Sequence, residues 1–172
     1  MAIINGKALV KDGRPLDRVY SNGQLVYGRN LLSGTKDFSG SWEFLSAVVN
    51  DGFYNGFIVK SQSEKGTGVF KRQIATRDGD YTFSVWVSAS AGQLAVLVIG
   101  KNRVAQASIV LPNTAFGWVK VMYTLKNVKS GDELTGRIDK TSDVSGKVSV
   151  AGHKWEYGSI ATPWTPAPED YI

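Results

Sequence analysis

His153 is the only histidine of the chain, and cysteine is absent. A Ser-His-Asp site or a related nucleophilic site would have to use this histidine, but Gly152-His153-Lys154-Trp155 shows no nucleophile-elbow pattern. A zinc site built from one histidine without cysteine is also unsupported. Neither G-x-x-x-x-G-K-S/T nor G-x-G-x-x-G occurs, so the usual nucleotide-binding loops are not predicted. We expect His153 to be a surface or half-buried residue of a strand.

Paired carboxylates are the remaining route to catalysis, because two acids flanking a glycosidic bond suffice for its hydrolysis. The candidates include Glu43, Asp51, Glu64, Asp80, Glu133 and Glu156. Their spacing forms no recognisable constellation, and isolated acids on a β-protein are usually solvated charges or turn formers. The sequence therefore predicts that the protein is not an enzyme.

The aromatic side chains are the best guide to function in this sequence. Sugars present apolar C–H faces and polar edges, and a ring flanked by hydroxyl, amide or charged groups matches both. Side chains alternate between the two faces of a strand, and the apolar, core-facing set of the stretch 81–88 is Tyr81, Phe83, Val85 and Val87. Trp86 therefore lies on the opposite face, among threonine and serine hydroxyls. We predict that Trp86 contacts sugar; the alternative is a ring covered by a loop or by the N-terminal arm.

Other aromatic residues are weaker candidates for the same site. In the stretch 117–126 the apolar set is Val119, Val121, Tyr123 and Leu125, which places Trp118 on the polar face with Lys120. Tyr54, beside Asn55, fits a rim contact. Trp42 could belong to the core or to the rim, with the core favoured. Structural roles are expected for Trp155, Tyr157 and Trp164.

Planar polar side chains would complete such a site by hydrogen bonding to sugar hydroxyls. Arg72, Gln73, Gln93, Asn102 and Arg103 are of this kind, and the sequence does not say which of them converge. The predicted carbohydrate-binding set is Trp86, Trp118, Tyr54, Trp42, Arg72 and Gln73.

The elements that must position these residues are short strands. Glycine-rich or Asp-Gly turns separate alternating stretches, as at Asp51-Gly52, Asp78-Gly79 and Ser130-Gly131-Asp132, and no capped helical periodicity occurs. The expected strands are 41–48, 53–60, 67–76, 80–90, 93–99, 104–110, 117–126, 134–139, 144–150 and 153–158. This pattern predicts an all-β fold of two packed antiparallel sheets. The proline-rich stretch 161–168 cannot pair as a central strand, and we expect it to run along the outside of the sandwich, pinned by Trp164.

The first 28 residues read as a separate piece. Asn22-Gly23 readily takes a two-residue hairpin turn, and Asp12-Gly13 marks a turn just upstream. Small hairpins are not stable alone, so we expect 1–28 to be an arm or linker docked on the main domain, 29–172, or on a neighbouring chain.

The composition narrows the possible partners. The net charge of +5 comes from scattered basic residues, with Lys71-Arg72 as the only adjacent pair, which favours neither DNA nor RNA but is compatible with an anionic wall polymer. No apolar run is long enough to span a membrane, and Met1-Ala2-Ile3-Ile4-Asn5 lacks the layout of a secretory signal.

Two segments resemble known proteins. The stretch from Asn30 to Trp42, NLLSGTKDFSGSW, resembles the opening strand of jelly-roll carbohydrate-binding modules. The stretch from Lys154 to Asp170, KWEYGSIATPWTPAPED, looks like the closing stretch of tail and baseplate proteins of phages that infect Gram-positive bacteria. The arm from Asn22 to Leu32, NGQLVYGRNLL, is similar to the lead-in that such modules carry.

The resemblance implies a jelly-roll module of a distal tail, baseplate or receptor-binding protein, which recognises host cell-wall polysaccharide on the bacterial surface as part of the virion. It implies other phage tail proteins as partners, and it supplies a delivery route that needs no signal peptide. No cofactor is expected. Related jelly rolls often hold a structural calcium near the sheet edge, for which Asp37 and Glu156 are conceivable oxygen ligands.

Three hypotheses follow, in descending order of support: a saccharide-binding module, a structural or assembly domain of a tail or baseplate without sugar binding, and a wall-degrading enzyme.

Overall fold

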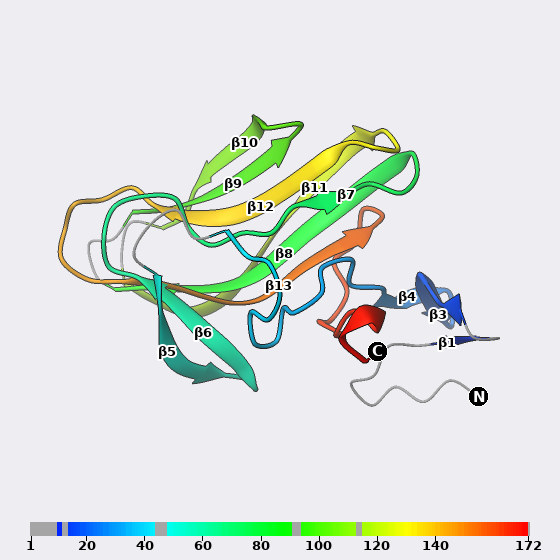
Figure 1. The fold of residues 1–172 in the computed structure, drawn as a ribbon, viewed down its shortest axis with the longest axis horizontal. Coiled ribbons are helices and arrows are strands. Elements are labelled where there is room, and N and C mark those ends of the chain that lie inside the picture. Colours follow the sequence, from blue (N-terminus) through cyan, green and yellow to red (C-terminus); the bar gives the residue numbers. More distant parts are fainter. Residues whose placement is uncertain (1–9, 12–13, 44–47, 91–93, 113–114, 172) are drawn as a thin grey trace.

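The structure is a computed structural model that describes residues 10–11, 14–43, 48–90, 94–112 and 115–171. Figure 1 shows two β-sheet layers packed against each other, with small hairpins from the N-terminal part at one end. The first sheet has four strands in the order β10-β9-β12-β7, and the second has five in the order β11-β8-β13-β6-β5. All pairings are antiparallel. The predicted two-sheet β-sandwich of the jelly-roll type is confirmed.

The four-stranded sheet consists of β7 (Gln73–Ile74), β9 (Ala95–Lys101), β10 (Val104–Val110) and β12 (Glu133–Lys140). The five-stranded sheet consists of β5 (Val48–Tyr54), β6 (Phe57–Gln62), β8 (Gly79–Ala89), β11 (Phe116–Val128) and β13 (Val148–Tyr157). The short 3-10 helix η1 (Pro168–Tyr171) follows near the C-terminus.

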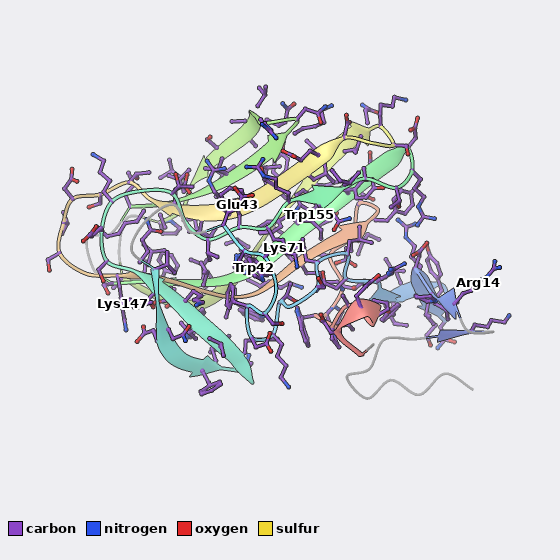
Figure 2. The ribbon with its side chains drawn as sticks, viewed as in Figure 1. Arg14, Trp42, Glu43, Lys71, Lys147 and Trp155 are labelled. Carbon is purple, nitrogen blue, oxygen red and sulfur yellow. The ribbon has the colours of Figure 1, made fainter. Side chains whose placement is uncertain are left out.

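The core lies between the two sheets, as alternation in β8 predicts. Tyr81, Phe83, Val85 and Val87 are fully buried, and each such side chain contributes about 1.5–3 kcal/mol by leaving water. The sheets approach each other closely at Gly136 of β12 and Phe83 of β8, where a Cβ added to Gly136 would lie 2.5 Å from the Phe83 ring. Trp155 and Trp42 are also buried and lie near the middle of the molecule in Figure 2.

Some predicted turns are bulges. Gly52 has a positive φ of 78°, but it lies inside β5, where the pairing register with β6 shifts; the chain reverses at Asn55-Gly56. Gly152, with φ 63°, lies at a register shift between Ala151 and Lys154, so the two predicted strands 144–150 and 153–158 form one bulged strand, β13. In the predicted strand 67–76, only β7 and an isolated bridge at Phe70 pair. The predicted strand 41–48 lies partly outside the described residues.

The N-terminal part forms two hairpins. β1 (Val10–Lys11) pairs with β2 (Arg14–Pro15), and β3 (Arg18–Ser21) pairs with β4 (Gln24–Gly28) across the predicted turn at Asn22-Gly23. The predicted turn at Asp12-Gly13 lies outside the described residues. The β3–β4 hairpin contacts the sandwich through Arg18, whose guanidinium donates to the carbonyl of Tyr157. The division into an arm, 1–28, and a domain, 29–172, stays a prediction.

Candidate functional site

The outer face of the five-stranded sheet carries a cluster of aromatic side chains. Trp86 lies on this face because its β8 neighbours at odd positions fill the core, and it is half-buried. On β11, Lys120 pairs directly with Trp86 and Met122 pairs with Ser84, so Trp118 shares the same outer face. Alternation therefore places Trp86 and Trp118 together, as the sequence predicts.

Tyr54 joins these two tryptophans from the opposite edge of the sheet. Its ring stacks on Trp118, with centroids 4.2 Å apart and planes 15° apart, and meets Trp86 edge-on at 5.5 Å. β5 and β11 are the two outermost strands of the five-stranded sheet, so the Tyr54 and Trp118 rings reach each other across its outer face. We call Tyr54, Phe57, Trp86, Trp118 and Trp164 the aromatic face.

A pocket of about 540 Å³ opens beside Trp86. This volume lies in the range of small-molecule sites. Its lining residues are Asn55, Phe57, Trp86, Lys120, Met122, Ala161, Pro163 and Trp164. Trp118 and Tyr54 do not line it; Tyr54 contacts the Trp86 ring, and Trp118 stacks on Tyr54. The pocket thus combines apolar walls with a few polar groups, the amide of Asn55 and the ammonium of Lys120.

Two aromatic residues of the pocket, Phe57 and Trp164, were not in the predicted site. Phe57 pairs with Tyr54 across the two-residue turn Asn55-Gly56, which brings both rings to the same face. Trp164, for which a structural role was expected, packs edge-on against Phe57 at 4.7 Å and donates its indole N–H to Thr35 Oγ1 at 3.0 Å. The Trp164 ring also borders a second pocket, of about 420 Å³, which contains Lys36, Asp37 and Asp170. The sequence features that could have indicated them are the Asn55-Gly56 turn, for Phe57, and the position between two prolines, for Trp164.

A buried charge network holds Trp164 in place. Lys154 and Glu156 are buried on the outer side of β13 and pair at 3.4 Å. Thr162 donates its N–H and its hydroxyl to the Glu156 carboxylate, at 2.8 and 2.7 Å, and accepts from Lys154 Nζ at 2.6 Å. Burial lowers the pKa of Lys154 to about 8, opposed by the Glu156 charge. This group, which we call the Thr162 latch, fixes the chain that leads into Trp164.

Lys120 ties the latch to the pocket. Its ammonium donates to the Thr162 carbonyl at 2.8 Å, and burial lowers its pKa, partly offset by Glu156. Lys120 is therefore a positioned donor at the pocket wall rather than a freely moving surface charge.

A row of hydroxyl groups continues the face beyond the aromatic rings. Ser149 pairs with Ser88 on β8 and with Ser61 on β6. The hydroxyls of Ser61 and Ser149 lie 2.6 Å apart, and Ser61 donates to Asp51, which also binds Lys147. These hydrogen bonds lower the pKa of Asp51 and keep it ionised.

Trp42 lies away from the aromatic face. It is 8% exposed and packs edge-on against Phe38 and His153, at 4.8 and 5.3 Å. The core position that the sequence favoured for Trp42 is thus the observed one. His153 is fully buried in the same cluster, so the expectation of a surface or half-buried histidine is wrong; the bulge at Gly152 turns its ring inward. Burial lowers the pKa of His153 to about 3.

Arg72 and Gln73 lie on the other sheet. Arg72 binds the Glu43 carboxylate through Nε and Nη2, at 2.6 and 3.0 Å, and Glu133 through Nη1 at 2.6 Å. Gln73 donates to the carbonyl of Ile74 on β7. The structure therefore does not bring these two residues to the aromatic face.

The conceivable calcium ligands do not converge. The Glu156 carboxylate is occupied by Lys154 and Thr162, whereas Asp37 is exposed and accepts from the Ser39 N–H. Among the described residues no group of three or more His, Cys, Asp or Glu side chains could hold a metal. The residues do not fit a calcium site.

None of the described helices has the length and apolarity needed to cross a membrane.

No protein family and no curated protein matches this chain by sequence. Solved structures match its fold. The carbohydrate-binding module TmCBM61, in complex with β-1,4-galactotriose, has a TM-score of 0.59 at 13% identity, covering 76% of this chain and all of that one. The xylan-binding domain CBM22-1 of Paenibacillus barcinonensis Xyn10C has 0.54 at 14%, covering 79% and 99%. The enzymatically active domain of tailspike protein 4 from bacteriophage CBA120 has 0.52 at 11%, covering 75% and 21%.

These likenesses define the class of fold: a β-sandwich of the kind found in carbohydrate-binding modules, with a similar sandwich inside a phage tailspike.

Proposed function

We propose that the aromatic face binds a saccharide without catalysis, and that the domain serves as an adhesion module of a phage tail or baseplate acting on host surface polysaccharide. The observation that carries the proposal is the pocket of about 540 Å³ between Trp86 and Trp164, on the face of a sandwich whose fold neighbours include sugar-binding modules. The indole rings offer apolar platforms, and Lys120 and Asn55 offer polar contacts, which is the combination that a sugar ring needs.

The geometry also divides the residues of the aromatic face into those that would contact the sugar and those that would support them. Trp86, Phe57 and Trp164 line the pocket and would touch the sugar, whereas Tyr54 supports the Trp86 ring and Trp118 stacks on Tyr54. Polysaccharide presented in many copies compensates for modest affinity at each site, because several domains on one particle act together. A virion location and a Gram-positive host belong to this proposal through the sequence resemblance, and the tailspike neighbour is consistent with a phage particle.

Affinity electrophoresis through gels containing β-1,4-galactan, xylan or purified Gram-positive wall polysaccharide tests the proposal. We expect at least one polymer to retard the protein, and Trp86→Ala and Trp164→Ala to weaken that retardation at least tenfold, as for anchoring aromatic residues in other interfaces. Trp118→Ala should have a smaller effect because its ring stacks on Tyr54 and does not line the pocket.

Phe53→Ala is the matched control. Phe53 neighbours Tyr54 on β5, is 78% exposed and is not part of the aromatic face. The proposal fails if no polymer retards the protein, or if Phe53→Ala weakens the retardation as much as Trp86→Ala does.

A structural role in a tail or baseplate is the second candidate. The edge strand β10 exposes Val104, Ile109 and Val110, which are 62%, 39% and 61% exposed, beside unpaired backbone groups. This candidate predicts stable complexes with tail subunits and no retention by any polysaccharide.

A further inference from the structure

A second pocket, on the outer face of the four-stranded sheet, contains three arginines. Its volume is about 250 Å³, and its lining includes Arg72, Arg103 and Arg137 around Phe70, Gly100 and Thr135. The guanidinium groups of Arg72 and Arg137 lie 5.4 and 5.6 Å from the centre of the Phe70 ring. The pocket is open because Gly100 has no side chain: a Cβ there would lie 2.4 Å from Thr135 Oγ1.

Arg103 reaches this pocket from a backbone conformation that residues other than glycine rarely adopt. Within the described chain, three two-residue turns have positive φ at both central positions: Asn22-Gly23, Asn55-Gly56 and Asn102-Arg103. The first two have glycine at the second position, as such turns prefer, whereas the third has arginine at φ 66°. A side chain in this region is strained by its own Cβ. The chain therefore keeps an arginine where glycine would be more stable.

The contacts that Arg103 makes within the protein do not offset this strain. Its side chain is 79% exposed, and its Nε lies 3.6 Å from Glu133. Exposed pairs of this kind contribute little. The turn is anchored instead by Asn102, whose side chain accepts from the Glu133 N–H and donates to Asp132. The structural explanation for Arg103 is therefore weak, and a role in binding is the better account.

The other two arginines differ in what they can offer. Arg72 donates from all three of its nitrogens to Glu43 and Glu133, which raise its pKa and hold its side chain in place. Arg137 contacts Asp139 through Nε at 2.9 Å. The hydrogen bonds of the described residues thus leave the terminal nitrogens of Arg103 and Arg137 as donors. Guanidinium forks match the planar or tetrahedral oxygens of carboxylates and phosphates.

We propose that this arginine pocket binds the oxyanion of a small molecule, a carboxylate or a phosphate. The pocket lies on the sheet opposite the aromatic face and does not depend on it. The ligand is small, because the volume falls below that of drug-sized sites. Glu43, Glu133 and Asp139 balance the formal charge of the three arginines, so recognition rests on hydrogen-bond geometry and on Arg103. The affinity for a single group is therefore modest.

Three ligands that share one ring test the proposal by NMR titration: glucuronate, glucose 6-phosphate and neutral glucose. We expect at least one of the anions to shift the amide signals of Gly100, Arg103 and Thr135 saturably, and glucose at equal concentration to leave them unchanged. The anion that binds identifies the source of the oxyanion. Arg103→Gly should weaken this binding at least fivefold while raising the melting temperature by about 2 °C, because the backbone strain is relieved.

Each opposite result overturns the proposal: no shift with either anion, equal shifts with glucose, undiminished binding by Arg103→Gly, or a lower melting temperature of that variant. Trp86→Ala should bind the anion as wild type does. Its behaviour separates failure of the arginine pocket from failure of the aromatic face, since the two sites are on different sheets.

Discussion

Acid should destabilise this protein through one residue, His153. The imidazole is fully buried among Phe38, Trp42 and Phe83, and burial lowers its pKa from 6.5 to about 3, a backbone contact with Val69 opposing the shift. The unfolded chain binds a proton on this ring below pH 6.5, whereas the folded chain does not until about pH 3. Stability is therefore lost as the pH falls below 6.5. Between pH 7 and pH 5 the loss amounts to about 2 kcal/mol.

Urea unfolding at pH 7 and pH 5 measures this loss. His153→Leu is the reference variant, since it removes the titrating group, retains an apolar side chain in the cluster and leaves every carboxylate unchanged. We expect the free energy of unfolding to fall between the two pH values by about 2 kcal/mol more in the wild type than in the variant. Equal pH dependence in the two proteins would refute the argument, because it would mean that the buried imidazole takes up its proton without unfolding.

Two further substitutions test the packing and the latch. Lys154→Met should lower the free energy of unfolding by about 3–5 kcal/mol, because it leaves the Glu156 carboxylate buried without its cation. Urea denaturation measures this loss, and adding Glu156→Leu to the variant should recover part of it. Gly136→Ala should cost about 1–3 kcal/mol, because the new methyl group would press on the Phe83 ring, whereas Gly117→Ala, with open space at its Cβ, should be nearly neutral in the same denaturation experiment.

Strand alternation was sufficient to predict two of the five residues of the aromatic face. In β8 and β11 the apolar residues recur at every second position without interruption, so the sequence alone places Trp86 and Trp118 together on the outer face. The same reasoning failed for β5 and β6. There the turn is at Asn55-Gly56 rather than Asp51-Gly52, and that shift brings Phe57 beside Tyr54.

Other parts of the site depend on features that alternation does not encode. Trp164 is on an extended segment held by the Thr162 latch, and a latch made of residues from two distant segments has no local signature. The bulge at Gly152 changes the side of the sheet to which the His153 side chain points. Strict alternation along the sequence does not predict such a bulge. Arg72 was assigned to the sugar site because its side chain suits hydroxyls, but the sheet to which β7 belongs is set by its pairing with β12.

The Thr162 latch also determines how the domain responds to mechanical force. The N–H of Gly28 donates to Thr162 Oγ1 at 3.0 Å, and Arg29 binds Glu169, so the chain enters and leaves the sandwich side by side (Figure 1). Tension applied at Arg29 and at η1 would be borne first by these few contacts, before it reaches the two sheets. A sufficient pull would draw Trp164 away from Phe57 before the strands of the two sheets separate, and would open the aromatic face in a sandwich that is still folded.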